Sequence, residues 1–225
     1  MLDFGSRKNI IASVILIAAI AGVIIFAVRG RGAGQSPSSL VLPVPFSPQA
    51  PNNNWSRNED CEETSVTMAN AFLTGTTEDK LPPEAAQQAI NNLRTWEQAN
   101  LGYNANTGAE ATTKMAEGAF GLKVQRINDY SEQDLKNALA GGHPVLLPIN
   151  ARLLNNPKYL DNGPLYHMVV ARGYNGKGFI VNDPGTDSGD GNVYPFATLK
   201  NAGADWNQAA KSLEPGTKVA LVLSK

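Results

Sequence analysis

Residues 60–73 read DCEETSVTMANAFL, and this stretch contains the only cysteine of the 225-residue chain. Apolar and small side chains recur along it at helical spacing, from Cys61 through Met68 to Phe72. The spacing predicts an amphipathic helix that packs this face on a core. The aspartate before Cys61 is a favourable N-cap, and the two glutamates that follow suit the positive end of the helix. Cys61 is therefore expected in the first turn of a packed helix.

Further elements lie on the C-terminal side of this helix. The patterns predict helices over residues 82–100, 108–119 and 131–140, the last with a serine cap and an aspartate three residues on. Runs typical of strands then predominate, and the pair Asn175-Gly176 is a strong hairpin signal between two of them. The predicted strands are 122–127, 144–149, 166–174, 178–182 and 218–223. A helical N-terminal half and a strand-rich, antiparallel C-terminal half predict an α+β fold.

Cys61 has two interpretations. A lone cysteine on an apolar stripe is commonly a small buried hydrophobic residue. A helix N-terminus, however, provides unpaired N–H groups and partial positive charge, which favour the nucleophilic thiolate. Glu62 and Glu63 oppose this effect, because nearby negative charge disfavours a second anion. A nucleophilic role for Cys61 therefore requires a cationic partner, and imidazolium is the natural one.

The chain has two histidines that could supply this partner. His167 opens the strand-like run HMVVARGY, and the turn after that run brings the chain back to Asp183, which precedes Pro184. The hairpin therefore predicts that Asp183 lies near His167, where a carboxylate could orient the ring and stabilise its charged form. Asp183 could also be an ordinary turn residue before proline. His143 is the alternative base, but no acidic residue lies at hairpin range from it.

Smaller signals leave other roles open. Gln49 could supply an amide donor to a tetrahedral oxyanion together with the backbone N–H of Cys61, or it could be a surface residue. The acidic loop 183–192 fails the spacing of a calcium-binding EF-hand, so we expect no metal and no cofactor. Trp55 and Trp96 could line a cleft, although core positions are more common for aromatic residues. The net charge of −1, without a basic stripe, gives no support to nucleic-acid binding.

The N-terminus differs from the rest of the chain. Residues 10–28 read IIASVILIAAIAGVIIFAV without a charge, and a helix of that length spans roughly 30 Å of hydrocarbon. The sequence therefore predicts a short tail over 1–9, a transmembrane helix over 10–28, a flexible linker over 29–43 and a domain over 44–225. A cleaved signal peptide is the alternative, but RGRGAGQ is a poor cleavage site. We expect an uncleaved signal anchor, with the domain on the extracytoplasmic side of the membrane.

Blocks of the sequence resemble a known family. VPFSPQAPNNNW, EDCEETSVTMANAFLTG, GGHPVLLPIN, HMVVARGY and FIVNDPG follow one another as in the papain-like cysteine peptidases of family C39, and most closely its C39-like branch. The resemblance implies a papain-like fold, with Cys61 as nucleophile, His167 as general base, Asp183 as orienting acid and Gln49 as oxyanion donor. Many members have Cys-Gly-Pro at the nucleophile, where this chain has Cys-Glu-Glu.

The resemblance implies a thiol peptidase that acts on a peptide or protein through an acyl-enzyme, and the uncharged run 10–28 adds the expected membrane anchor. The chain has no ATPase domain, so leader removal coupled to export is not supported. Two alternatives stay open: a papain-like module that binds peptides without turnover, and a cell-wall peptide amidase. The substrate and the oligomeric state are left open.

Overall fold

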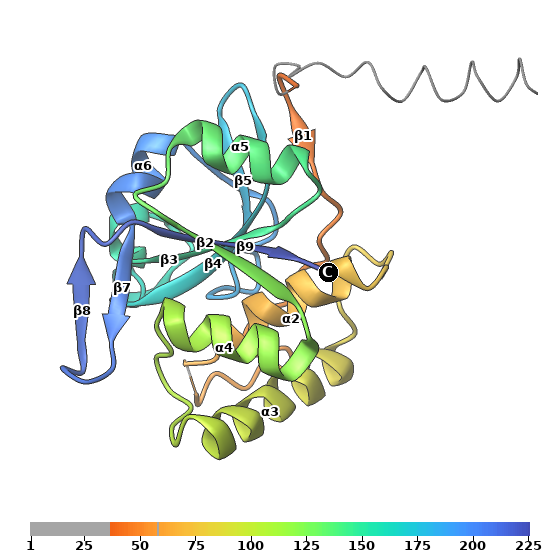
Figure 1. Ribbon diagram of the computed structural model, residues 1–225, viewed down its shortest axis with the longest axis vertical. Coiled ribbons are helices and arrows are strands. Elements are labelled where there is room, and N and C mark those ends of the chain that lie inside the picture. The colour runs from red at the N-terminus through yellow and green to blue at the C-terminus, as the bar shows by residue number, and fades with distance from the viewer. Residues whose placement is uncertain (1–36, 58) are drawn as a thin grey trace, which may run out of the picture. The chain divides into compact units, whose positions relative to one another are not determined.

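The computed structural model describes residues 37–57 and 59–225 (Figure 1). The predicted tail 1–9, the predicted transmembrane helix 10–28 and most of the predicted linker 29–43 lie outside the described residues. Within the part of the chain that is described, no helix is long and apolar enough to cross a membrane.

A seven-stranded antiparallel sheet forms the centre of the domain. Its strands follow the order β2-β9-β3-β4-β5-β6, and β1 pairs with β4 outside this order. Two further strands, β7 and β8, pair with each other in a small second sheet. The strands are β1 (Leu40–Val41), β2 (Lys123–Asn128), β3 (Val145–Ile149), β4 (His167–Asn175), β5 (Gly178–Asn182), β6 (Asn192–Tyr194), β7 (Ala204–Asn207), β8 (Ser212–Pro215) and β9 (Val219–Ser224).

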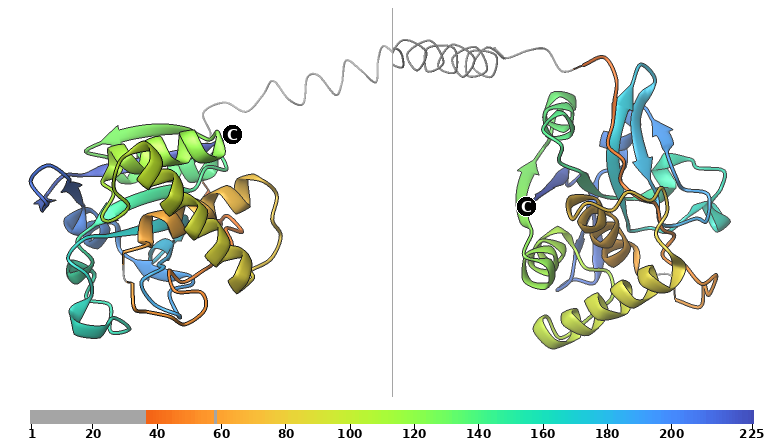
Figure 2. Two further views of the ribbon diagram at one scale, coloured as in Figure 1. Left: turned by 90° about the horizontal axis from the view of Figure 1, so that it is seen from below. Right: turned by 90° about the vertical axis from the view of Figure 1, so that its right-hand side faces the viewer.

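The described residues form five α-helices, and two short 3-10 helices precede β4. Helices α2, α3 and α4 pack against one another, and α2 also packs on β4 (Figures 1 and 2). Helix α5 packs instead on β1, β3 and β4. The helices are α2 (Cys61–Leu73), α3 (Pro83–Asn100), α4 (Ala109–Phe120), α5 (Glu132–Ala140) and α6 (Phe196–Ala202), with the 3-10 helices η1 (Ala151–Leu154) and η2 (Leu160–Asn162).

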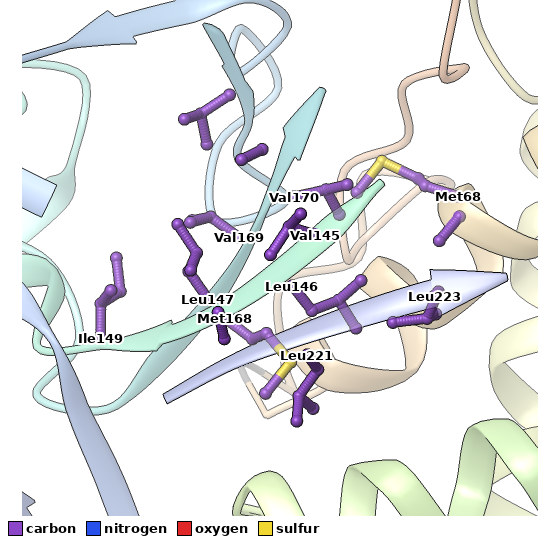
Figure 3. Close-up of a cluster of buried hydrophobic side chains, with 14 of the residues drawn as sticks. Met68, Val145, Leu146, Leu147, Ile149, Met168, Val169, Val170, Leu221 and Leu223 are labelled. Carbon is purple, nitrogen blue, oxygen red and sulfur yellow. The ribbon is translucent and has the colours of Figure 1, made fainter. Parts of the chain in front are cut away.

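The core of the domain lies where α2 meets the central strands. Strand β3 is buried along its whole length, and β4 is buried except at two positions near its end. Figure 3 shows that Met68 of α2 lies in one cluster with the aliphatic side chains of β3, β4 and β9. Because β3 and β4 are covered on both faces, they are nearly continuous apolar runs in the sequence. This packing holds the first turn of α2 against the start of β4.

The element types predicted from the sequence are confirmed for the four longer helices and the five predicted strands, with ends that differ by at most one residue. The capping box of α5 is present, with Ser131 and Asp134 bonding each other's backbone N–H groups. The prediction that Asp60 caps α2 through its side chain is wrong. Its Oδ1 accepts a hydrogen bond from Arg57 Nε at 2.7 Å instead, because a nearby guanidinium is a stronger donor than an amide.

The N-terminal edge of the domain also differs from the prediction. Leu40 and Val41, which the sequence placed in the linker, form β1 against Tyr174 and Gly173 of β4. A Cβ at position 173 would lie 2.4 Å from the carbonyl oxygen of Leu40, so only glycine admits this close approach. Two residues are too few for a strand pattern to be recognised in a sequence.

Candidate active site

Cys61 is the first residue of α2 and is 4% exposed. The backbone N–H of Met168, the residue after His167, lies near its sulfur and acts to lower the pKa of the thiol. One turn further along α2, Ser65 Oγ donates to the carbonyl oxygen of Met168 at 3.3 Å. These two contacts hold the start of α2 over the start of β4, so the thiol lies beside the strand position that His167 opens.

His167 and Asp183 are in direct contact, as the hairpin predicted. His167 Nε2 lies 2.8 Å from Asp183 Oδ1, and both side chains are buried. Strand β5 runs antiparallel to β4 and pairs Asn182 with Val170, so Asp183 emerges beside the first residues of β4. With Nε2 engaged by the carboxylate, Nδ1 is the ring nitrogen left to exchange a proton with a thiol.

The carboxylate of Asp183 has three further partners. Tyr159 Oη donates to its Oδ2 at 2.5 Å, Asn156 Nδ2 lies 3.5 Å from Oδ2, and the N–H of Gly185 donates to Oδ1 at 3.0 Å. Burial acts to raise the pKa of this carboxyl, but the imidazole of His167 and these donors outweigh it and lower the pKa. Asp183 is thus an anion in position to stabilise an imidazolium.

Gln49 lies close to the same loop. Its backbone N–H donates to the carbonyl oxygen of Pro184 at 2.9 Å, and its side chain is 6% exposed. The side-chain oxygen is buried and has no hydrogen-bond partner among the described residues. The interpretation of Gln49 as a solvent-exposed loop residue is therefore wrong, because the chain before α2 packs down onto the loop after β5.

A cleft of 610 Å³ opens beside this group. Its wall includes Gln49, Tyr159 and Gly185, and a Cβ on Gly185 would lie 3.0 Å from the His167 ring. Trp55 also lines the cleft, as does Leu160, which is 89% exposed. The cleft therefore reaches the layer that covers His167, with apolar surface available to a bound chain.

The alternative base, His143, lies in a different place. It sits in the turn before β3, whose other end pairs Ile149 with His167. Six residues of extended chain separate positions 143 and 149, which corresponds to about 20 Å. His143 is thus at the far end of the strand from His167. Trp96 packs against the hydrophobic core, as the more common role of aromatic residues predicted, whereas Trp55 lines the cleft.

The acidic loop after β5 shows no arrangement of metal ligands. Asp183 binds His167, and Asp190 Oδ1 pairs with Arg172 at 3.0 Å. Across residues 37–57 and 59–225, no group of three or more His, Cys, Asp or Glu side chains is arranged to hold a metal ion.

Sequence reasoning did not find Tyr159, Asn156 or Gly185 as members of this site. The first two lie in the irregular segment between η1 and η2, which has no periodic pattern. Their contacts with Asp183 span 24 and 27 residues, so no local signal marks them.

Electrostatics at Cys61 itself disfavour an anion. Burial raises the pKa of the thiol well above its ordinary value, and Glu62 and Glu63 raise it further. The sulfur lies 2.9 Å from Glu62 Oε2. A charged imidazole beside the sulfur would act in the opposite direction.

Comparison with known proteins identifies a family and a related fold. The model of a family described as "Peptidase C39 like family" matches residues 41–214 of the chain. A crystal structure of a Bacillus anthracis protein, described there as a C39-like peptidase, superposes with a TM-score of 0.52 at 18% sequence identity. The alignment covers 84% of this chain and 99% of that one. At this identity the likeness shows the fold alone. No curated protein matches the chain.

Proposed function

We propose, because this chain belongs to the peptidase C39-like family, that it is a cysteine peptidase with Cys61 as nucleophile and His167 as general base. The observation that supports the proposal is that the first turn of α2, with Cys61, lies on Met168 at the start of β4, next to the buried His167–Asp183 pair. A nucleophile, a base and a group that orients the base are the components of thiol acyl transfer.

The reaction begins with transfer of the thiol proton from Cys61 to Nδ1 of His167. The sulfur then attacks the substrate carbonyl, a C–S bond forms, and the carbonyl π electrons move to oxygen. When the C–N bond breaks, the imidazolium gives its proton to the departing amine. Water, deprotonated by His167, then hydrolyses the thioester and restores the thiol.

The remaining residues have supporting roles in this scheme. Asp183 holds Nε2 of the ring and stabilises its charged form, and Tyr159, Asn156 and Gly185 hold Asp183. Gln49 and the N–H of Cys61 stabilise the oxyanion. The cleft beside Trp55 and Leu160 receives the peptide.

A peptide-binding module without turnover is the second candidate. It is favoured by the low exposure of Cys61 and by the carboxyl group of Glu62 on its sulfur, since both disfavour a thiolate. The two candidates differ in one property that can be measured directly, which is the reactivity of the thiol in the folded chain.

An active-site-directed probe separates the two candidates. We expect a peptide carrying a thiol-reactive vinyl sulfone to label the full chain at Cys61 at least about a hundred times faster than it labels free cysteine, because the site both binds the peptide and ionises the thiol. His167→Ala should reduce labelling to the free-cysteine rate, and Cys61→Ala should abolish it. Labelling of wild type no faster than of His167→Ala would instead support the binding module.

The same proposal includes an anchor in the membrane. It rests on the uncharged run over residues 10–28, which is long enough to span a bilayer as a helix. We expect the full chain to remain with the membrane fraction after a carbonate wash, and a chain that begins at residue 37 to be released. Release of both forms would contradict the anchor.

A further inference from the structure

The carboxyl group of Glu62 touches the atom that would carry out the chemistry. Its Oε2 lies 2.9 Å from the Cys61 sulfur, and Glu62 is 1% exposed. The other oxygen, Oε1, makes no hydrogen bond of good geometry to any described residue. The proton in the O···S contact can belong to either atom, so its position determines whether the contact hinders or assists the thiolate.

Two more buried carboxyl groups lie next to Glu62. Glu63 follows it on α2, Glu97 lies on α3, and both are 1% exposed or less. Burial raises the pKa of both groups, and the charges of Glu97 and Glu62 raise that of Glu63 further. Three acidic side chains of α2 and α3 are thus buried close to one another.

No cation compensates Glu62 within residues 37–57 and 59–225. The nearby guanidinium groups of Arg57 and Arg94 pair with Asp60, at 2.7 and 3.7 Å. From the segments between α3 and β4, the phenol of Tyr166 and the backbone N–H of Thr107 face the carboxyl. His167 pairs with Asp183 instead. An ionised Glu62 would thus be a buried, unpaired charge.

Burial is the main cause that raises the pKa of Glu62, to about 8, and Glu97 raises it as well. The thiol and the N–H groups of Glu62 and Thr107 act in the opposite direction, but by less. At neutral pH the carboxyl is consequently protonated in most molecules, which makes it a donor rather than an acceptor.

We infer that the neutral carboxyl of Glu62 is a catalytic group of this site, which donates its O–H to the Cys61 thiolate and loses this function when it ionises. The inference rests on the proposed function. When His167 takes the thiol proton, the sulfur gains a lone pair and the Glu62 O–H turns toward it. Glu62 keeps its own proton throughout, so no additional reactant is needed.

The ionised form of Glu62 has the opposite effect. When Cys61, His167 and Glu62 together lose one proton, the thiol is protonated again and His167 is neutral. Glu62 is then a carboxylate that accepts a hydrogen bond from the thiol. Because the carboxyl ionises more readily than the buried thiol, this thiol–carboxylate form replaces the thiolate–imidazolium form as the pH rises. The Glu-Glu pair after the nucleophile is then compatible with turnover near neutral pH.

The test measures the rate at which iodoacetamide alkylates Cys61 in the full chain between pH 5 and 9.5. We expect the wild-type rate to fall about tenfold from pH 7.5 to 9. One pH unit above the pKa of Glu62, only about a tenth of the molecules keep its carboxyl protonated. In Glu62→Gln the amide donates at every pH, so the rate should not fall in this range. Glu63→Gln is the matched control, since it removes a neighbouring buried carboxyl that does not bond the sulfur, and it should retain the fall.

The outcomes separate this inference from the proposed function. Identical profiles for wild type and Glu62→Gln, with alkylation faster than that of a free thiol, would overturn only the role of Glu62. Alkylation no faster than that of a free thiol at any pH would overturn the proposed function as well. If Glu62→Gln does not fold, the carboxylic-acid infrared band of wild type decides: a shift upon alkylation of Cys61 supports the inference, and an unchanged band rejects it.

Discussion

Cys61→Ser should reduce peptide hydrolysis by at least about ten-thousandfold in kcat/KM, while the domain stays folded. A hydroxyl forms an anion far less readily than a thiol, and the proposed mechanism requires His167, paired with Asp183, to take a proton from residue 61. Binding of the peptide in the cleft should persist, so KM should change little. Steady-state hydrolysis of a fluorogenic peptide, with circular dichroism of the same preparation, measures both quantities.

Ser65→Ala is a suitable control for this variant. Ser65 lies on the same face of α2 one turn beyond Cys61, and its hydroxyl bonds the carbonyl oxygen of Met168 at 3.3 Å. Its removal costs about one hydrogen bond in stability, but we expect activity within a few-fold of wild type. If Cys61→Ser retained more than a few per cent of wild-type activity, another nucleophile would have to carry the reaction.

The buried glutamates should make the domain more stable at pH 5 than at pH 8. Burial raises the pKa of Glu62 to about 8, and it also raises that of Glu63 and Glu97. Between the ordinary pKa of 4.5 and these higher values, the folded chain holds protons that the unfolded chain has lost. The stabilising contribution is complete below pH 4.5 and is lost as the pH rises toward the folded-state pKa.

For Glu62 the expected slope is about 1.4 kcal/mol of unfolding free energy per pH unit between its ordinary and its raised pKa, and Glu63 and Glu97 act in the same direction. Urea unfolding of the full chain at pH 5, 6, 7 and 8 measures the change of unfolding free energy with pH. Glu62→Gln should remove the part of this change that Glu62 causes. Asp183, whose pKa is lowered, adds no pH dependence in this range. Its stabilising contribution is fully present above its ordinary pKa of 3.8 and is lost only as the pH falls below that value.

Glu110→Gln is the matched control for the pH dependence. Glu110 is exposed on α4 and pairs with Lys114 at 2.7 Å, which lowers its pKa. It is therefore ionised in both the folded and unfolded chains above pH 5, and its replacement should leave the slope unchanged. A stability that does not vary from pH 5 to 8, or that rises with pH, would contradict the protonated state of the buried cluster.

Local patterns predicted those parts of the site that are set by short-range geometry. The turn at Asn175-Gly176 fixes the pairing of β4 with β5, and this pairing brings His167 to Asp183 across 16 residues. The helical spacing after Cys61 likewise predicted the start of α2. The cap by Asp60 was predicted incorrectly, because its competing partner, Arg57, is not part of the capping motif.

The long-range contacts could not be predicted in the same way. Tyr159 and Asn156 reach Asp183 from a segment without secondary-structure periodicity, and Glu97 reaches Glu63 from another helix. Each contact depends on how separate elements pack, and many packings satisfy the same local pattern. The sequence shows Glu62 and Glu63 directly after Cys61, but it does not indicate that Glu97 is buried near them.

The sequence by itself determined the order of helices and strands, the hairpin that joins His167 to Asp183, and the helix that begins at Cys61. These features follow from hydrophobic period and turn chemistry, which act over a few residues. Only the tertiary structure decided that the sulfur lies against the start of β4, that Gln49 is buried beside the loop after β5, and that no cation of the described residues pairs with the buried Glu62 carboxyl. Burial and charge compensation depend on neighbours distant in the chain, and they in turn decide which of these groups hold a proton.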